Sequence, residues 1–106
     1  MVDAVEAYQE LQRLHADDPD VAAGQMFGKP CLKVGGKAFV AQHLGTVVFK
    51  LSGDAHAQAM AQPGAASWDP SGKGRPMKEW VALPATASRQ FAALAKAAHA
   101  YVAGAA

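Results

Sequence analysis

The sequence predicts an α+β domain of two layers, in which helices from both ends of the chain pack on an antiparallel sheet. Three observations support this prediction: a helical apolar stripe near the N-terminus, apolar runs separated by glycine turns over residues 26–51, and a second helical stripe near the C-terminus. A chain of 106 residues is long enough for one modest core. We therefore expect residues 1–106 to form a single domain.

The first helix is predicted over residues 3–16. Asp3 is placed to cap its N-terminus. Residues 17–20 (DDPD) should end it, because acids oppose the negative helix terminus and proline disfavours helix at the preceding residue. Residues 21–25 then lead into the sheet. The apolar residues of the helix recur at intervals of three and define its buried face: Val5, Tyr8, Leu11 and Leu14.

The central stretch, residues 26–51, is predicted to form a three-stranded antiparallel meander. Gly35-Gly36 tolerates the positive φ angles of a two-residue hairpin turn. Gly45 indicates a second tight turn after Leu44. Together these turns predict the following cross-strand pairs: Val34 with Lys37, Leu32 with Phe39, Cys31 with Val40, His43 with Thr46, Ala41 with Val48, and Val40 with Phe49.

Both faces of this meander carry apolar side chains, although a sheet with one face in water should alternate cleanly. One face is expected to lie under the helices, with Cys31, Ala38, Val40, Val47, Phe49 and Leu51. The other face is either half covered by the chain itself or covered by a second copy, because exposed apolar patches mark interfaces. The predicted interface residues on that face are Leu32, Val34, Phe39 and Val48.

The second half of the chain completes the two layers. Asp54 can cap a short helix through about Ala61, and a loop-rich segment follows over residues 62–76, with Trp68 as an anchor against the core. Residues 78–83 read as a fourth strand, with Trp80 and Ala82 on one face and Val81 and Leu83 on the other. The last helix is predicted over residues 86–102, with an apolar stripe of Phe91, Leu94, Ala98 and Tyr101.

Charge and cysteine content narrow the functional class. The formal net charge is +1, which gives no general attraction to nucleic acid or to an anionic membrane. Residues 1–20 hold six acids and one base, which favours a solvated acidic helix on a mildly basic body. With one cysteine, Cys31, no intramolecular disulfide can form. No leader or apolar membrane span is visible, so we expect a cytoplasmic protein without membrane contact.

No catalytic or metal-binding constellation stands out in the sequence. The four histidines, His15, His43, His56 and His99, do not show the spacing of metal ligands. In the predicted register Cys31 and His43 point to opposite faces of the sheet, which argues against a nucleophile–base pair. We therefore expect no catalytic residues, no metal and no cofactor.

The most chemically distinctive stretch is residues 69–80, DPSGKGRPMKEW. Lys73, Arg75 and Lys78 lie close together, and neighbouring glycines leave backbone N–H groups open, so the loop can hold a phosphate or a carboxylate. Trp68 and Trp80 can stack a base or another ring. The alternative is a structural turn, in which the cations pair with nearby acids and the tryptophans pack in the core.

Three segments resemble the pattern of the TfoX N-terminal domain family: residues 26–28 (MFG), 35–39 (GGKAF) and 75–81 (RPMKEWV). The resemblance extends from about Tyr8 to Val102 and implies a bacterial α+β protein with a curved antiparallel sheet. The name-giving members are regulators of natural competence that carry a second, C-terminal domain. The YjbR-like proteins are a related bacterial family of similar fold. The resemblance implies no catalytic residues at positions of this chain.

The functional expectation is a non-enzymatic regulatory module that acts through protein contacts, with a second copy or another protein as the partner. One alternative is the binding of a small anion or nucleotide at Lys73, Arg75 and Lys78, with Trp68 or Trp80 as a wall. A further alternative is regulatory contact with DNA, which the net charge of +1 disfavours.

Overall fold

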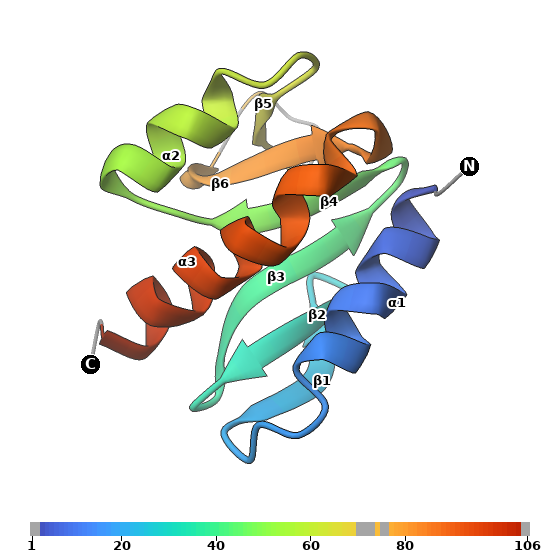
Figure 1. The fold of residues 1–106 in the computed structure, drawn as a ribbon, viewed down its shortest axis with the longest axis vertical. Helices are drawn as coiled ribbons and strands as arrows, with labels where there is room; N and C mark the ends of the chain where they lie inside the picture. Colours follow the sequence, from blue (N-terminus) through green and yellow to red (C-terminus); the bar gives the residue numbers. More distant parts are fainter. Residues whose placement is uncertain (1–2, 70–73, 75–76, 105–106) are drawn as a thin grey trace.

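The computed structural model describes residues 3–69, 74 and 77–104, and within them six antiparallel strands form one sheet (Figure 1). The strand order is β1-β2-β3-β4-β6-β5. The elements along the chain are α1 (Ala4–Leu14), β1 (Val21–Met26), β2 (Lys29–Val34), β3 (Lys37–His43), β4 (Thr46–Lys50), α2 (Gly53–Met60), β5 (Ala66–Trp68), β6 (Met77–Pro84), the 3-10 helix η1 (Ala85–Gln90) and α3 (Phe91–Gly104).

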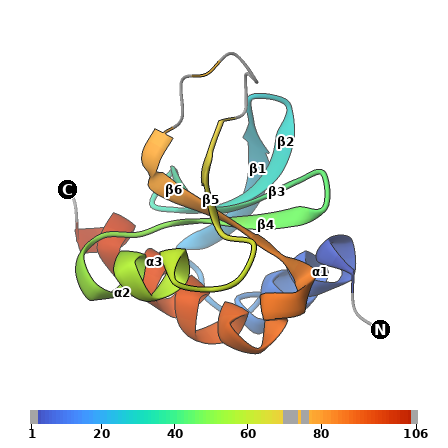
Figure 2. The same cartoon turned by 90° about the horizontal axis from the view of Figure 1, so that it is seen from above.

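The helices cover one face of the sheet, as Figure 2 shows, so the predicted α+β class with two layers is confirmed. On the opposite face the sheet is strongly curved, and the β1–β2 hairpin and β5 rise from it. Among the described residues, no helix combines the length and the apolar character needed to span a bilayer.

Helix α1 begins as predicted, because the carboxylate of Asp3 accepts a hydrogen bond from the backbone N–H of Glu6 at 2.8 Å. Its buried face differs from the prediction. Val5 and Leu14 are 48% and 56% exposed. The small alanines allow the helix to lie close to the sheet, and the buried stripe follows the spacing i, i+3, i+4, i+7: Ala4, Ala7, Tyr8 and Leu11.

The sheet contains two strands that the sequence did not predict. Residues 21–26, expected to lead into the sheet, form β1 and pair with β2 from Val21 opposite Val34 to Met26 opposite Lys29. Their alanines and glycine have low strand propensity, and tertiary pairing overrides it. Residues 66–68, expected as loop, form the short edge strand β5 against β6. The predicted fourth strand is β6, with Trp80 and Val81 on opposite faces as expected.

The register between β2 and β3 contains a β-bulge. The Gly35-Gly36 turn is confirmed, with φ angles of 58° and 83°. However, Leu32 lies opposite Val40, and Cys31 lies opposite Ala41, so the predicted pairs of Leu32 with Phe39 and Cys31 with Val40 are wrong. Phe39 is the extra residue on β3, and one extra residue shifts the register by one position. The register between β3 and β4 is confirmed: His43 with Thr46, Ala41 with Val48, and Val40 with Phe49.

Because of the bulge, the two faces carry different residues from those predicted. Cys31, expected under the helices, lies on the opposite face in a second cluster with Ala41, Val48, Trp68, Trp80 and Ala82. Phe39 and Val40 both join the core under the helices. The four predicted interface residues are all buried within the single chain, so that prediction is wrong. Leu32, Val34 and Phe39 lie in the core under the helices, and Val48 lies in the second cluster.

The C-terminal helix begins later than predicted. Residues 85–90 form the 3-10 helix η1, and α3 begins at Phe91. The predicted apolar stripe is confirmed for Phe91, Leu94 and Ala98, which are buried, while Tyr101 is half-buried. This arrangement sets the start of α3 beside α1, where a groove remains between the two helices.

Candidate functional site

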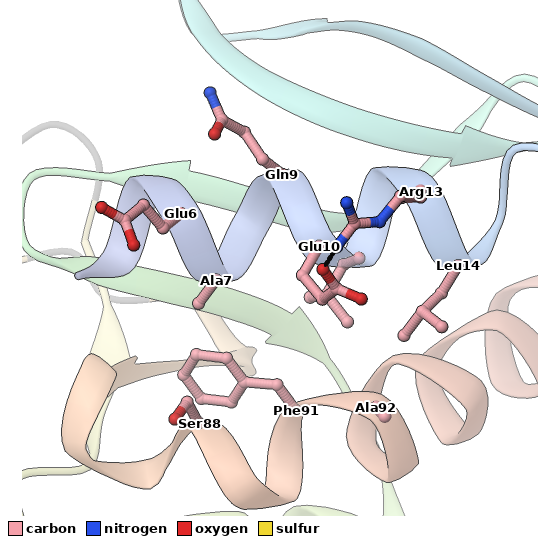
Figure 3. Close-up of a pocket in the computed structure, with 10 residues that line it drawn as sticks. Glu6, Ala7, Gln9, Glu10, Arg13, Leu14, Ser88, Phe91 and Ala92 are labelled. Carbon is pink, nitrogen blue, oxygen red and sulfur yellow. Dashed lines mark ion pairs between the residues drawn. The ribbon is translucent and has the colours of Figure 1, made fainter. Parts of the chain in front are cut away.

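An open groove of about 530 Å³ lies between α1 and the segment formed by η1 and α3 (Figure 3). Its size falls within the range of small-ligand and peptide side-chain pockets. Apolar residues form its inner part: Ala7, Leu11, Leu14, Phe91 and Ala92. Polar residues line the remainder: Glu6, Gln9, Glu10, Arg13 and Ser88.

The groove follows from the side chains that the two helices turn toward each other. Ala7 points from α1 toward the ring of Phe91 (Figure 3), and both residues are buried. Farther along, Leu14 of α1 and Ala92 of α3 also line the groove. Leu14 lacks a large partner there and is 56% exposed. A partly exposed leucine in the same groove as a buried aromatic ring gives the groove an apolar anchor point.

The charges around the groove are mostly negative. Arg13 forms an ion pair with Glu10, but both side chains are well exposed, so the pair contributes little to stability. Within the described part of the chain, the carboxylate of Glu6 has no cationic partner. The groove therefore presents an apolar floor with one uncompensated carboxylate at its rim.

Of the predicted anion-binding residues, the structure describes Trp68, Lys78 and Trp80, and the two tryptophans do not form the wall of an open site. Trp68 and Trp80 are only 3% and 4% exposed, with ring centroids 5.5 Å apart, so they pack against each other in the second cluster. Lys78 is exposed, and its carbonyl oxygen accepts a hydrogen bond from His56 Nε2 at 2.8 Å. Lys73 and Arg75 lie outside the described residues, so binding at that loop stays a prediction.

The described part of the loop after β5 agrees with the alternative in which this stretch is a structural turn. Asp69 Oδ2 accepts a hydrogen bond from the backbone N–H of Gly74 at 2.8 Å. A carboxylate of the chain itself thus occupies one of the N–H groups that an external anion would need.

Cys31 and His43 lie on the same face of the sheet, because the bulge places Cys31 opposite Ala41, two residues before His43. The prediction of opposite faces is wrong for this reason. Cys31 is fully buried, and burial raises the pKa of its thiol, which keeps the sulfur protonated and poorly nucleophilic. Among the described residues, no three histidine, cysteine or acidic side chains are arranged to hold a metal ion.

Two further histidines tie the ends of helices together. His99 Nε2 of α3 lies 3.0 Å from Asp18 Oδ2, and the His99 ring stacks on His15 at 6.1 Å. The pKa of Asp18 is lowered, first by the backbone N–H of Asp20 and then by His99. These contacts hold α3 against the turn after α1, so the structure gives His15 and His99 a role in packing.

Comparison of the chain with protein-family models, with curated proteins and with solved structures gave no match. The resemblance to the TfoX N-terminal domain family therefore stays a prediction.

Proposed function

We propose that this chain is a non-enzymatic, TfoX N-terminal-like regulatory module of the bacterial cytoplasm that binds a segment of a partner protein in the groove between α1 and α3. The observation that supports the proposal is the groove itself, about 530 Å³ in volume, with a partly exposed Leu14 at its edge. Two helices that leave such a groove suit the recognition mode in which the apolar face of a third helix lies between them.

The charge of the rim favours a partner segment with a basic residue next to its apolar anchor. Among the described residues, Glu6 has no cationic partner, whereas Glu10 forms an ion pair with Arg13. A lysine or arginine of the partner would complement Glu6. Complementary charge of this kind increases the association rate and the selectivity more than the affinity.

The same charges disfavour a second copy of this chain as the occupant. A twofold dimer brings the same surface patch of both subunits together. Across this groove, the dimer would place the rim with Glu6 and Glu10 against an identical rim. Like charges at close range destabilise such a contact, so a different, basic chain is the better partner.

The test is a selection of random displayed peptides against the wild-type protein, followed by affinity measurements with three variants. We expect the selected peptides to share an apolar anchor beside lysine or arginine. Leu14→Asp should weaken them by about tenfold or more, since a charge replaces the anchor contact. Glu6→Lys should weaken them mainly at low salt.

Val5→Asp is the matched control, because Val5 is similarly exposed on α1 but does not line the groove. It should bind the peptides as the wild type does. Selected peptides that bind equally well to Leu14→Asp, or a selection that enriches no sequence, would overturn the proposal.

A further inference from the structure

Two large apolar residues are exposed in a strained backbone conformation at one end of the sheet. Phe27 and Leu44 both have φ of 54°, and they are 62% and 81% exposed. Left-handed backbone costs a residue with a side chain about 1–2 kcal/mol, and it is uncommon for bulky side chains. Neither the strain nor the exposure helps the chain fold, which indicates another role for these side chains.

The curvature of the sheet brings these turns close to an element from its far edge. Phe27 lies in the turn between β1 and β2, and Leu44 lies in the turn between β3 and β4, so both turns are at the same end of the sheet. Trp68 of β5 contacts both regions, with ring centroids 6.4 Å from Phe27 and 5.9 Å from His43. Figure 2 shows the β1–β2 hairpin and β5 rising on the same face, opposite the helices.

Trp68 fixes the orientation of the His43 ring. The indole N–H of Trp68 donates a hydrogen bond to His43 Nδ1 at 2.9 Å. In the neutral imidazole the proton then resides on Nε2, which becomes a donor. Within the described part of the chain, His43 Nε2 has no hydrogen-bond partner.

A cation lies beside this donor. Continuing the register of Cys31 opposite Ala41 by two residues places Lys29 across from His43 on the same face. Burial and, second, the ammonium of Lys29 lower the pKa of His43, which agrees with this proximity and keeps the ring neutral. Lys29 forms no ion pair with any other described residue. The location therefore offers two side-chain donors of hydrogen bonds, one of them charged.

We propose that Phe27, Lys29, His43 and Leu44 form a binding site, here called the hairpin-tip site, for a carboxylate carried by an apolar group. The Lys29 ammonium and the His43 Nε2–H would donate to the carboxylate oxygens, while Phe27 and Leu44 contact the apolar group. One cation and one neutral donor match a singly charged anion, whereas a phosphate typically recruits arginine or several cations.

The test uses phenylacetate as the probe and its uncharged analogue phenylacetamide as the control, followed by two-dimensional amide NMR. Saturable shifts of the Trp68 indole N–H and of the Phe27 and Leu44 amides are expected with phenylacetate. Phenylacetamide should bind about tenfold more weakly, because it lacks the charge. Inorganic phosphate should not compete for the site.

Lys29→Met should weaken phenylacetate about tenfold, and Lys96→Met is the matched control, since Lys96 is exposed on α3. A peptide that ends in phenylalanine, tested with a free and with an amidated C-terminus, distinguishes a protein terminus from a free small acid as the source of the carboxylate. Equal binding of phenylacetamide, unchanged binding by Lys29→Met, or shifts confined to other regions would overturn the proposal. Leu14→Asp should leave this binding intact, so the two proposals fail independently.

Discussion

Truncation of two leucines on α1 separates a residue that holds the fold together from one that is available to a partner. Leu11 and Leu14 lie one turn apart and both fit the apolar spacing of the helix. In the structure Leu11 is 1% exposed, whereas Leu14 is 56% exposed at the edge of the groove. The variants Leu11→Ala and Leu14→Ala remove the same atoms from these two environments.

The expected costs follow from the burial of each side chain. Leu11→Ala leaves a cavity in the core under the helices and should lower the free energy of unfolding by about 3 kcal/mol, within the range of such truncations. Leu14 buries less than half of its surface and would leave no enclosed cavity, so Leu14→Ala should cost about 1 kcal/mol or less. The helix propensities of leucine and alanine enter both variants equally and cancel in the comparison.

Urea denaturation followed by tryptophan fluorescence measures both values, at two protein concentrations tenfold apart. The reasoning is refuted if Leu14→Ala destabilises the protein as much as Leu11→Ala. A wild-type midpoint that rises with protein concentration, and does so less in Leu14→Ala, would show that Leu14 is buried against a second copy. The groove would then be occupied by that copy instead of by a basic partner segment.

Three further substitutions test other parts of the structure. Gly64→Ala should lower the free energy of unfolding by about 1–2 kcal/mol, which a lower thermal midpoint would show, because φ is 82° and the new Cβ would lie 2.9 Å from Pro84 Cγ. Tyr8→Phe should raise the free energy of unfolding in urea by about 1 kcal/mol, since the buried hydroxyl has no hydrogen-bond partner among the described residues. The pKa of His43 is lowered by burial and by Lys29, so the unfolded chain binds its proton more readily. Wild-type stability should therefore fall as pH decreases from about 6.5 toward the lowered pKa, and His43→Asn should reduce this slope in urea titrations at several pH values.

The parts of the fold that the sequence predicts well are those with a local physical cause. Asp3 caps α1 because its carboxylate reaches the N–H of Glu6. Gly35-Gly36 forms a hairpin because both residues have positive φ. Such signals depend on a few neighbouring residues, so they can be recognised without knowledge of the rest of the chain.

The β-bulge at Phe39 has no comparable signal. Residues 38–41 are apolar throughout, so a shift of one position leaves an apolar side chain on each face. The sequence pattern is therefore equally compatible with both registers. This single shift places Cys31 on the face away from the helices and Phe39 in the core under them, which is the reverse of the predicted faces.

The sequence pattern also does not predict the groove between α1 and α3. It forms between α1 and α3, which lie at opposite ends of the chain, and its opening depends on how closely these helices pack. The periodicity of α1 suggested that Leu14 is buried. Only the position of the small Ala92 near it shows why Leu14 remains partly exposed.

The hairpin turns of this sheet provide an internal comparison that bears on function. At one end the turn between β2 and β3 uses two glycines, which adopt positive φ without strain. At the other end the turns between β1 and β2 and between β3 and β4 hold Phe27 and Leu44 in the same left-handed region. Asparagine or glycine would serve these turns better if they only reversed the chain. Phe27 and Leu44 thus occupy these turns against local preference, at the end of the sheet where Trp68 orients His43. Conflicts of this kind are expected at functional sites.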